Sequence, residues 1–114
     1  MAVFDRAYLA RFTLGNESLE REVLGLFAAQ VPLYLERLTV AETSLAWKEA
    51  AHTLKGAAGG LGLQRLARLA AAAEKLEVFA VAAASDTAAA KAEAVRVLTA
   101  AADEALRAIG APAR

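Results

Sequence analysis

The sequence predicts an all-α protein: an antiparallel four-helix bundle with a short additional N-terminal helix. The chain has 114 residues, which suits one domain, and we place a single helical-bundle domain over residues 1–114. Hydrophobic residues make up 58% of the chain, and much of this fraction is alanine, the strongest helix former but a poor source of buried area. Alternating apolar and polar residues, which indicate strands, are absent. We therefore expect closely packed helices around a thin core.

The first two helices are predicted from apolar residues at helical spacing. Residues 4–13 form a short amphipathic helix on the positions Phe4, Tyr8, Leu9 and Phe12. Gly15 ends this helix, and Asn16 is expected to be the N-cap of the next one. The second helix carries a stripe that we expect to face the core: Leu19, Val23, Leu26 or Phe27, Val31, Tyr34 and Leu38. Pro32 lies inside this helix and predicts a kink, because proline removes a backbone donor.

The third and fourth helices are joined by a glycine-rich turn. Thr43 or Ser44 is expected to cap the third helix, which continues to about Leu61. Gly62 suits a left-handed position at its end. The fourth helix has residues spaced like the seam of a bundle helix: Leu66, Leu69, Ala73 and Leu76.

A fifth helix completes the predicted bundle. Ser85 or Asp86 is expected to cap it, and Gly110 and Pro112 to stop it. Its inward residues are expected to be Val95, Leu98, Ala102, Leu106 and Ile109.

Charge and composition exclude several classes of function. The net charge is zero, with 13 basic and 13 acidic residues, which argues against a nucleic-acid partner. The absence of cysteine excludes disulfides and thiolate metal sites, and a single histidine excludes a His-rich metal site. We expect no apolar run long enough to span a bilayer and no membrane partner. The N-terminus lacks the features of a signal peptide, so we expect a cytoplasmic protein. We also expect the protein to be a monomer.

The single histidine lies on the polar side of the third helix. With His52 at 0° on a helical wheel of about 100° per residue, the large apolar residues lie on the opposite side. They are Trp47, Leu54 and Leu61, accompanied by Ala50. On the His52 side lie Lys48, Gly56 and Gly59, each within about 40° of it, and Lys55, about 60° from it. A core histidine is therefore disfavoured, whereas an idle surface histidine stays open.

The neighbours of His52 favour phosphoryl transfer. Glycine within a helix costs roughly 0.5–1 kcal/mol relative to alanine, yet Gly56 and Gly59 lie on the histidine's face and leave space for a bulky group. Lys55 supplies a positive charge for an incoming anion, and a neutral imidazole is a competent nucleophile. Neither a P-loop nor a glycine-rich kinase loop is present. We therefore expect a carrier rather than an enzyme, with no cofactor of its own, and Mg²⁺ supplied by the partner.

At these residues the sequence resembles the histidine-containing phosphotransfer (HPt) family. The segment Ala51-His52-Thr53-Leu54-Lys55-Gly56 matches the family's AHxLKG core, and the similarity continues through Leu61-Gly62 to Leu66, Leu69 and Glu74. The resemblance implies a four-helix bundle in which His52 is phosphorylated on Nε2, and partners that are receiver domains of response regulators and hybrid histidine kinases. It also implies that Lys55 stabilises the phosphate, that Gly56 clears space for docking and that Glu74 hydrogen-bonds the imidazole. Residues 57–60, Ala-Ala-Gly-Gly, depart from the small polar residues usual in the family.

Two alternatives stay open at this point. A helical adaptor or regulator could bind a kinase or response regulator without being phosphorylated, with His52 vestigial. Glu74 could be a solvated acid paired with a neighbouring cation such as Arg68 instead of an acceptor for His52. The sequence identifies neither the upstream kinase and downstream regulator nor the direction of phosphoryl flux.

Overall fold

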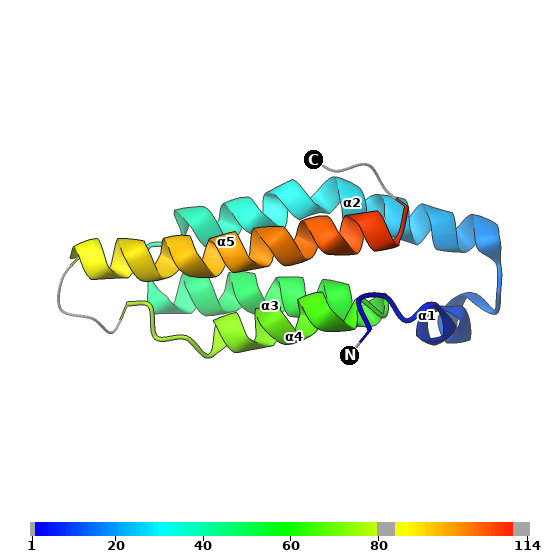
Figure 1. Ribbon diagram of the computed structural model, residues 1–114, viewed down its shortest axis with the longest axis horizontal. Helices are drawn as coiled ribbons and strands as arrows, with labels where there is room; N and C mark the ends of the chain where they lie inside the picture. Colours follow the sequence, from blue (N-terminus) through cyan, green and yellow to red (C-terminus); the bar gives the residue numbers. More distant parts are fainter. Residues whose placement is uncertain (1, 80–83, 111–114) are drawn as a thin grey trace.

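Helices make up the regular structure of the described part of the chain, residues 2–79 and 84–110 of a computed structural model. They are α1 (Arg6–Thr13), α2 (Glu17–Val40), α3 (Ser44–Gly60), α4 (Gln64–Glu74) and α5 (Ala84–Ala108). The molecule is elongated, 50 × 23 × 21 Å, with α1 packed at one end beneath the beginning of α2 (Figure 1). The predicted class, a four-helix bundle preceded by a short helix, is confirmed.

Capping side chains begin three of the helices. Asp5, Asn16 and Thr43 each accept a hydrogen bond from the backbone N–H three residues further on, at 3.0, 3.0 and 3.1 Å. The caps at Asn16 and Thr43 confirm the prediction from sequence. The prediction of Ser85 or Asp86 as a cap is wrong, because α5 already includes the residue before them. Asp86 instead lies in the first turn, where an acid favourably meets the helix dipole.

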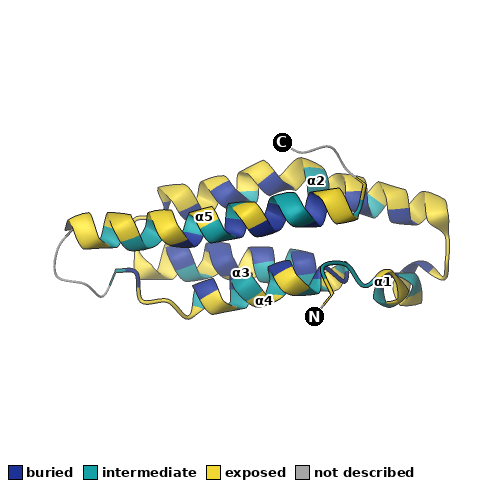
Figure 2. Ribbon diagram, viewed as in Figure 1, coloured by how far each residue is buried: buried dark blue, intermediate teal, exposed yellow. Residues whose placement is uncertain are grey.

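The core is formed by one face of each long helix, shown in dark blue in Figure 2. On α2 the buried stripe is Leu24, Phe27, Val31, Leu35 and Leu38. Of the predicted alternatives Leu26 and Phe27, Phe27 is the buried residue. The prediction that Leu19 faces inward is wrong: Leu19 and Leu26 are both exposed, because α2 carries apolar residues on two faces and the core takes the other face. Leu76 is also exposed, at 46%, since α4 ends two residues before it. The helix α2 is continuous across Pro32, and the kink there stays a prediction.

The second helix is more apolar than we expected from the sequence. By length and mean hydropathy, Glu17–Val40 could cross a membrane, which corrects the expectation that no segment reaches that limit. Only 28% of the apolar window is buried inside the bundle. The helix nevertheless has five buried apolar side chains, as a helix of a folded bundle does.

The N-terminal segment is fastened across the α3–α4 turn. The backbone N–H of Asp5 donates to the Gly62 carbonyl at 2.8 Å, and the Gln64 side chain donates to the Asp5 carboxylate at 3.1 Å. Gly62 has a φ of +81°, the left-handed conformation predicted for it. A Cβ at Gly62 would lie 2.6 Å from the Asp5 carbonyl oxygen, so only glycine permits this close approach.

Candidate functional site

His52 lies in the middle of α3 with its imidazole in solvent. Its side chain is 65% exposed, whereas its neighbours Ala51 and Leu54 are completely buried. Trp47 and Ala50 are buried on the same inner face. The apolar residues of α3 therefore hold the helix against the bundle and leave the histidine on the outer face, as the wheel predicted.

Glu74, from the neighbouring helix α4, bridges two polar residues of the motif, His52 and Lys55. Its Oε2 lies 3.2 Å from His52 Nδ1, and its Oε1 lies 3.3 Å from Lys55 Nζ. Partial burial acts to raise the pKa of the Glu74 carboxyl, but the hydrogen bond and charge of Lys55, followed by those of His52, outweigh it and lower that pKa below its ordinary value. The group is therefore a carboxylate at neutral pH and accepts from both neighbours.

Packing between α3 and α4 determines where Glu74 lies. Trp47 donates its indole N–H to the carbonyl of Ala73 at 2.8 Å, and both residues are buried. This bond fixes the end of α4 against α3 one residue before Glu74. Alanine at positions 70 and 73 of the buried face lets the two helices approach closely. The buried contact between Trp47 and Ala73 thus positions the Glu74 carboxylate beside His52.

The contact with Glu74 determines the tautomer of His52. A carboxylate accepts but cannot donate, so the proton of a neutral imidazole lies on Nδ1. The lone pair is then on Nε2, and Nε2 has no hydrogen-bond partner within the described residues. Nε2 is therefore the ring nitrogen whose lone pair is available to an electrophile.

The helix face beyond His52 is bare. A Cβ placed on Gly56 would meet no atom within 4 Å, and one on Gly59 would meet only the Ala67 methyl, at 3.8 Å. Neither residue has a positive φ. The bundle itself could thus accommodate alanine at both positions, so the internal packing gives no reason for glycine there.

A second ion pair adjoins the site and was not predicted from the sequence. Lys48, one turn before His52, lies 3.1 Å from Glu77. Glu77 follows α4, and only the packing of α3 on α4 brings it to Lys48, so sequence periodicity offered no signal for this pair. A shallow depression of about 380 Å³ adjoins the histidine, lined by Lys48, Glu49, His52, Thr53 and Glu74.

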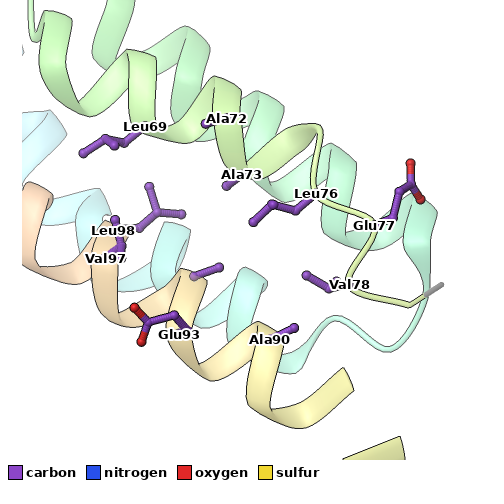
Figure 3. Close-up of a pocket in the computed structure, with 11 residues that line it drawn as sticks. Leu69, Ala72, Ala73, Leu76, Glu77, Val78, Ala90, Glu93, Val97 and Leu98 are labelled. Carbon is purple, nitrogen blue, oxygen red and sulfur yellow. The ribbon is translucent and has the colours of Figure 1, made fainter. Parts of the chain in front are cut away.

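An apolar groove of about 400 Å³ lies on the other side of α4. Figure 3 shows Leu69, Ala73 and Leu76 on one wall of this groove, opposite Val97 and Leu98 of α5. Ala73 lines the groove while the next residue, Glu74, contacts His52. The end of α4 therefore separates the groove from the polar site.

A helical bundle that presents one solvent-exposed histidine, buttressed by a carboxylate and a lysine, has the form of a phosphoryl carrier. The family model for the Hpt domain matches residues 22–109, most of the chain, and the chain therefore belongs to the Hpt domain family. Hpt domains are carriers in histidine phosphotransfer of two-component signalling. The match includes all of α3 and α4 and excludes α1. Neither a curated protein nor a solved structure matches the chain.

Proposed function

We propose that His52 Nε2 accepts a phosphoryl group from the phospho-aspartate of a receiver domain and passes it to the aspartate of another receiver. The observation that carries the proposal is the orientation of the imidazole: Nδ1 contacts Glu74 at 3.2 Å, while Nε2 has no hydrogen-bond partner among the described residues and the side chain is 65% exposed. The Hpt family assignment supports the same chemistry. The receivers would be those of response regulators and hybrid histidine kinases, and we place the exchange in the cytoplasm.

The transfer is a single in-line displacement. The lone pair of Nε2 forms the N–P bond while the bond from phosphorus to the aspartyl oxygen breaks, and the electron pair of that bond stays with the departing carboxylate. The imidazole keeps its proton on Nδ1 and so becomes positively charged. Glu74 lies beside this charge and stabilises it. Because the ring keeps its Nδ1 proton, it leaves as a neutral imidazole when the phosphoryl group passes to the next aspartate.

Lys55 has a different role in each state of the site. In the unphosphorylated protein its ammonium contacts Glu74 Oε1 at 3.3 Å. A phosphoryl group on Nε2 would bring a second set of anionic oxygens next to this cation, one turn away on the same helix. We infer that Lys55 then shares its charge between the carboxylate and the phosphoryl oxygens, which lowers the free energy of the phosphorylated form.

The receiver would complete the active site. The open helix face at Gly56 and Gly59 supports close approach of a protein surface to His52. The acidic pocket and Mg²⁺ that this chemistry needs would belong to the receiver, so the bundle acts as substrate and carrier.

The test is incubation with a receiver domain carrying a labelled phospho-aspartate. The wild-type protein should gain label that is labile to acid and stable to alkali, and His52→Gln should gain none. Arg96→Ala is the matched control, because Arg96 is exposed on α5, outside this site, and should label normally. Co-sedimentation with the receiver but no label on His52 would contradict the carrier function and favour the adaptor alternative.

A further inference from the structure

The outer face of α2 carries a regular apolar stripe. Its members are Leu19, Leu26, Leu33 and Val40, each seven residues from the next, and their exposed fractions lie between 40% and 60%. On a wheel of about 100° per residue they all fall within about 40° of Leu26, and about 150° from the centre of the buried stripe. Figure 2 shows exposed residues along the full length of α2. The stripe therefore makes no contribution to the core.

The spacing of this stripe is that of one of the two apolar positions in a heptad seam. An apolar repeat of seven residues keeps one side facing a second helix, whereas scattered surface leucines show no such period. Ala29 lies near the middle of the stripe and is small enough to let another backbone approach. This outer face is also the reason why α2 is apolar enough to meet the hydropathy limit of a membrane span.

Two charged residues on the same face as the stripe are arranged with two-fold symmetry. Glu22 and Arg37 are equally distant from the midpoint between Ala29 and Gln30, and so are Leu26 and Leu33. Glu22 and Arg37 are exposed, and neither forms an ion pair with any residue in 2–79 or 84–110. If two copies of α2 pair antiparallel about that midpoint, each Glu22 faces the Arg37 of the other copy. In a parallel pair Glu22 would face Glu22, and Arg37 would face Arg37.

We propose that the outer face of α2 is a dimer interface for a second copy of this chain, with the two α2 helices antiparallel. Leu26 of each copy packs beside Leu33 of the other, and two Glu22–Arg37 pairs flank this centre. The proposal replaces the expectation of a monomer and does not depend on the phosphotransfer function. Binding of this face to a membrane surface is disfavoured, because α2 has no lysine or tryptophan and carries acids beside the stripe.

Sedimentation velocity over about 1 µM to 1 mM protein tests the interface in the absence of any receiver. One apolar helix face is a small interface, so we expect a dimer with micromolar affinity. Leu26→Glu should weaken dimerisation by about 100-fold, because two leucines leave the seam and two carboxylates enter it. Leu45→Glu is the matched control: Leu45 is exposed but lies on α3, and its variant should dimerise normally. Unchanged helical circular dichroism excludes unfolding, since both side chains are exposed.

A charge exchange tests the antiparallel alignment. Glu22→Arg and Arg37→Glu should each weaken the dimer by about fivefold, and the double variant should restore wild-type affinity. A wild-type protein that is monomeric at 1 mM, including one that instead binds phosphatidylserine vesicles, would overturn the proposal. A dimer insensitive to Leu26→Glu would overturn it as well. A double variant no tighter than the single ones would overturn the antiparallel pairing.

Discussion

Substitutions at Gly56 distinguish the effect of this residue on folding from its effect on docking of the receiver domain. The residue lies inside α3, its φ is not positive, and a Cβ there would meet no atom within 4 Å. Alanine can therefore adopt the native backbone without a clash. Its benefit comes from the smaller conformational freedom of the unfolded chain and from its higher helix propensity.

The expected stabilisation is about 0.5–1 kcal/mol for Gly56→Ala. For a domain of this size it corresponds to a rise in Tm of about 2–6 °C. Gly56→Gln should fold with a stability between those of wild type and Gly56→Ala, since a straight-chain residue is also a better helix former than glycine. Its longer side chain, however, would stand on the docking face one turn from His52. We expect phosphotransfer from a receiver to be slowed by at least about tenfold in this variant.

The measurements are urea unfolding followed by circular dichroism, and the rate at which His52 gains label. Gly25 provides a matched control, because it too lies inside a helix with open space where a Cβ would be, but on α2. Gly25→Ala should give a similar gain in stability, and Gly25→Gln should transfer at the wild-type rate. If Gly56→Ala lowered stability, the reasoning about open space would be refuted. Wild-type transfer by Gly56→Gln would show that the gap has no role in docking.

Four further outcomes are expected. His52→Gln should change the free energy of unfolding by less than about 0.5 kcal/mol, because it alters an exposed side chain, and a larger loss in urea unfolding would refute this. Glu74→Ala should reduce the share of the imidazole tautomer with its proton on Nδ1, measured from the ¹⁵N chemical shifts of the ring, and should slow transfer; an unchanged tautomer would remove the orienting role. Gly62→Ala should cost at least about 1–2 kcal/mol and speed amide exchange at Asp5, since its left-handed backbone and close contact both oppose a Cβ; normal exchange there would contradict the fastening of the N-terminal segment. Lys55 and His52 lower the pKa of Glu74 in the folded protein. The stabilisation from that carboxylate is therefore present above the pKa that Glu74 has in the unfolded chain, and it is lost as the pH falls through the pKa of the folded state. Glu74→Gln should remove this part of the pH dependence of the unfolding free energy, and an unaltered dependence would contradict the reasoning.

Local patterns in the sequence were sufficient to predict the helices and the helix face on which His52 lies. The caps at Asn16 and Thr43 and the left-handed Gly62 each depend on residues within one or two turns, so they could be predicted. The orientation of His52 followed from the period of α3, where only one face is strongly apolar. On α2 the same method chose Leu19 wrongly and left Leu26 and Phe27 undecided, because two apolar faces compete and periodicity cannot say which one the other helices cover.

Contacts between helices were less predictable. The family resemblance pointed to Glu74, but the residues alone left its neighbour open, because the rotation of α4 about its axis is set by packing. The Lys48–Glu77 pair and the hydrogen bond between Asp5 and Gly62 join residues 29 and 57 positions apart in the chain. Such contacts appear only once the helices are assembled, and neither leaves a local pattern.

The intrinsic fluorescence of Trp47 reports on the structure of the site. Trp47 is the single tryptophan of the chain, it is completely buried, and its N–H is bonded to the carbonyl that precedes Glu74. Its fluorescence emission is therefore sensitive to how the end of α4 packs against α3. Any event that displaces Glu74 by moving this helix end would break the indole's hydrogen bond and admit water, which shifts the emission to longer wavelength. Docking and transfer could thus be followed in real time on the unlabelled protein, and a variant that moves only the carboxylate would leave the spectrum unchanged.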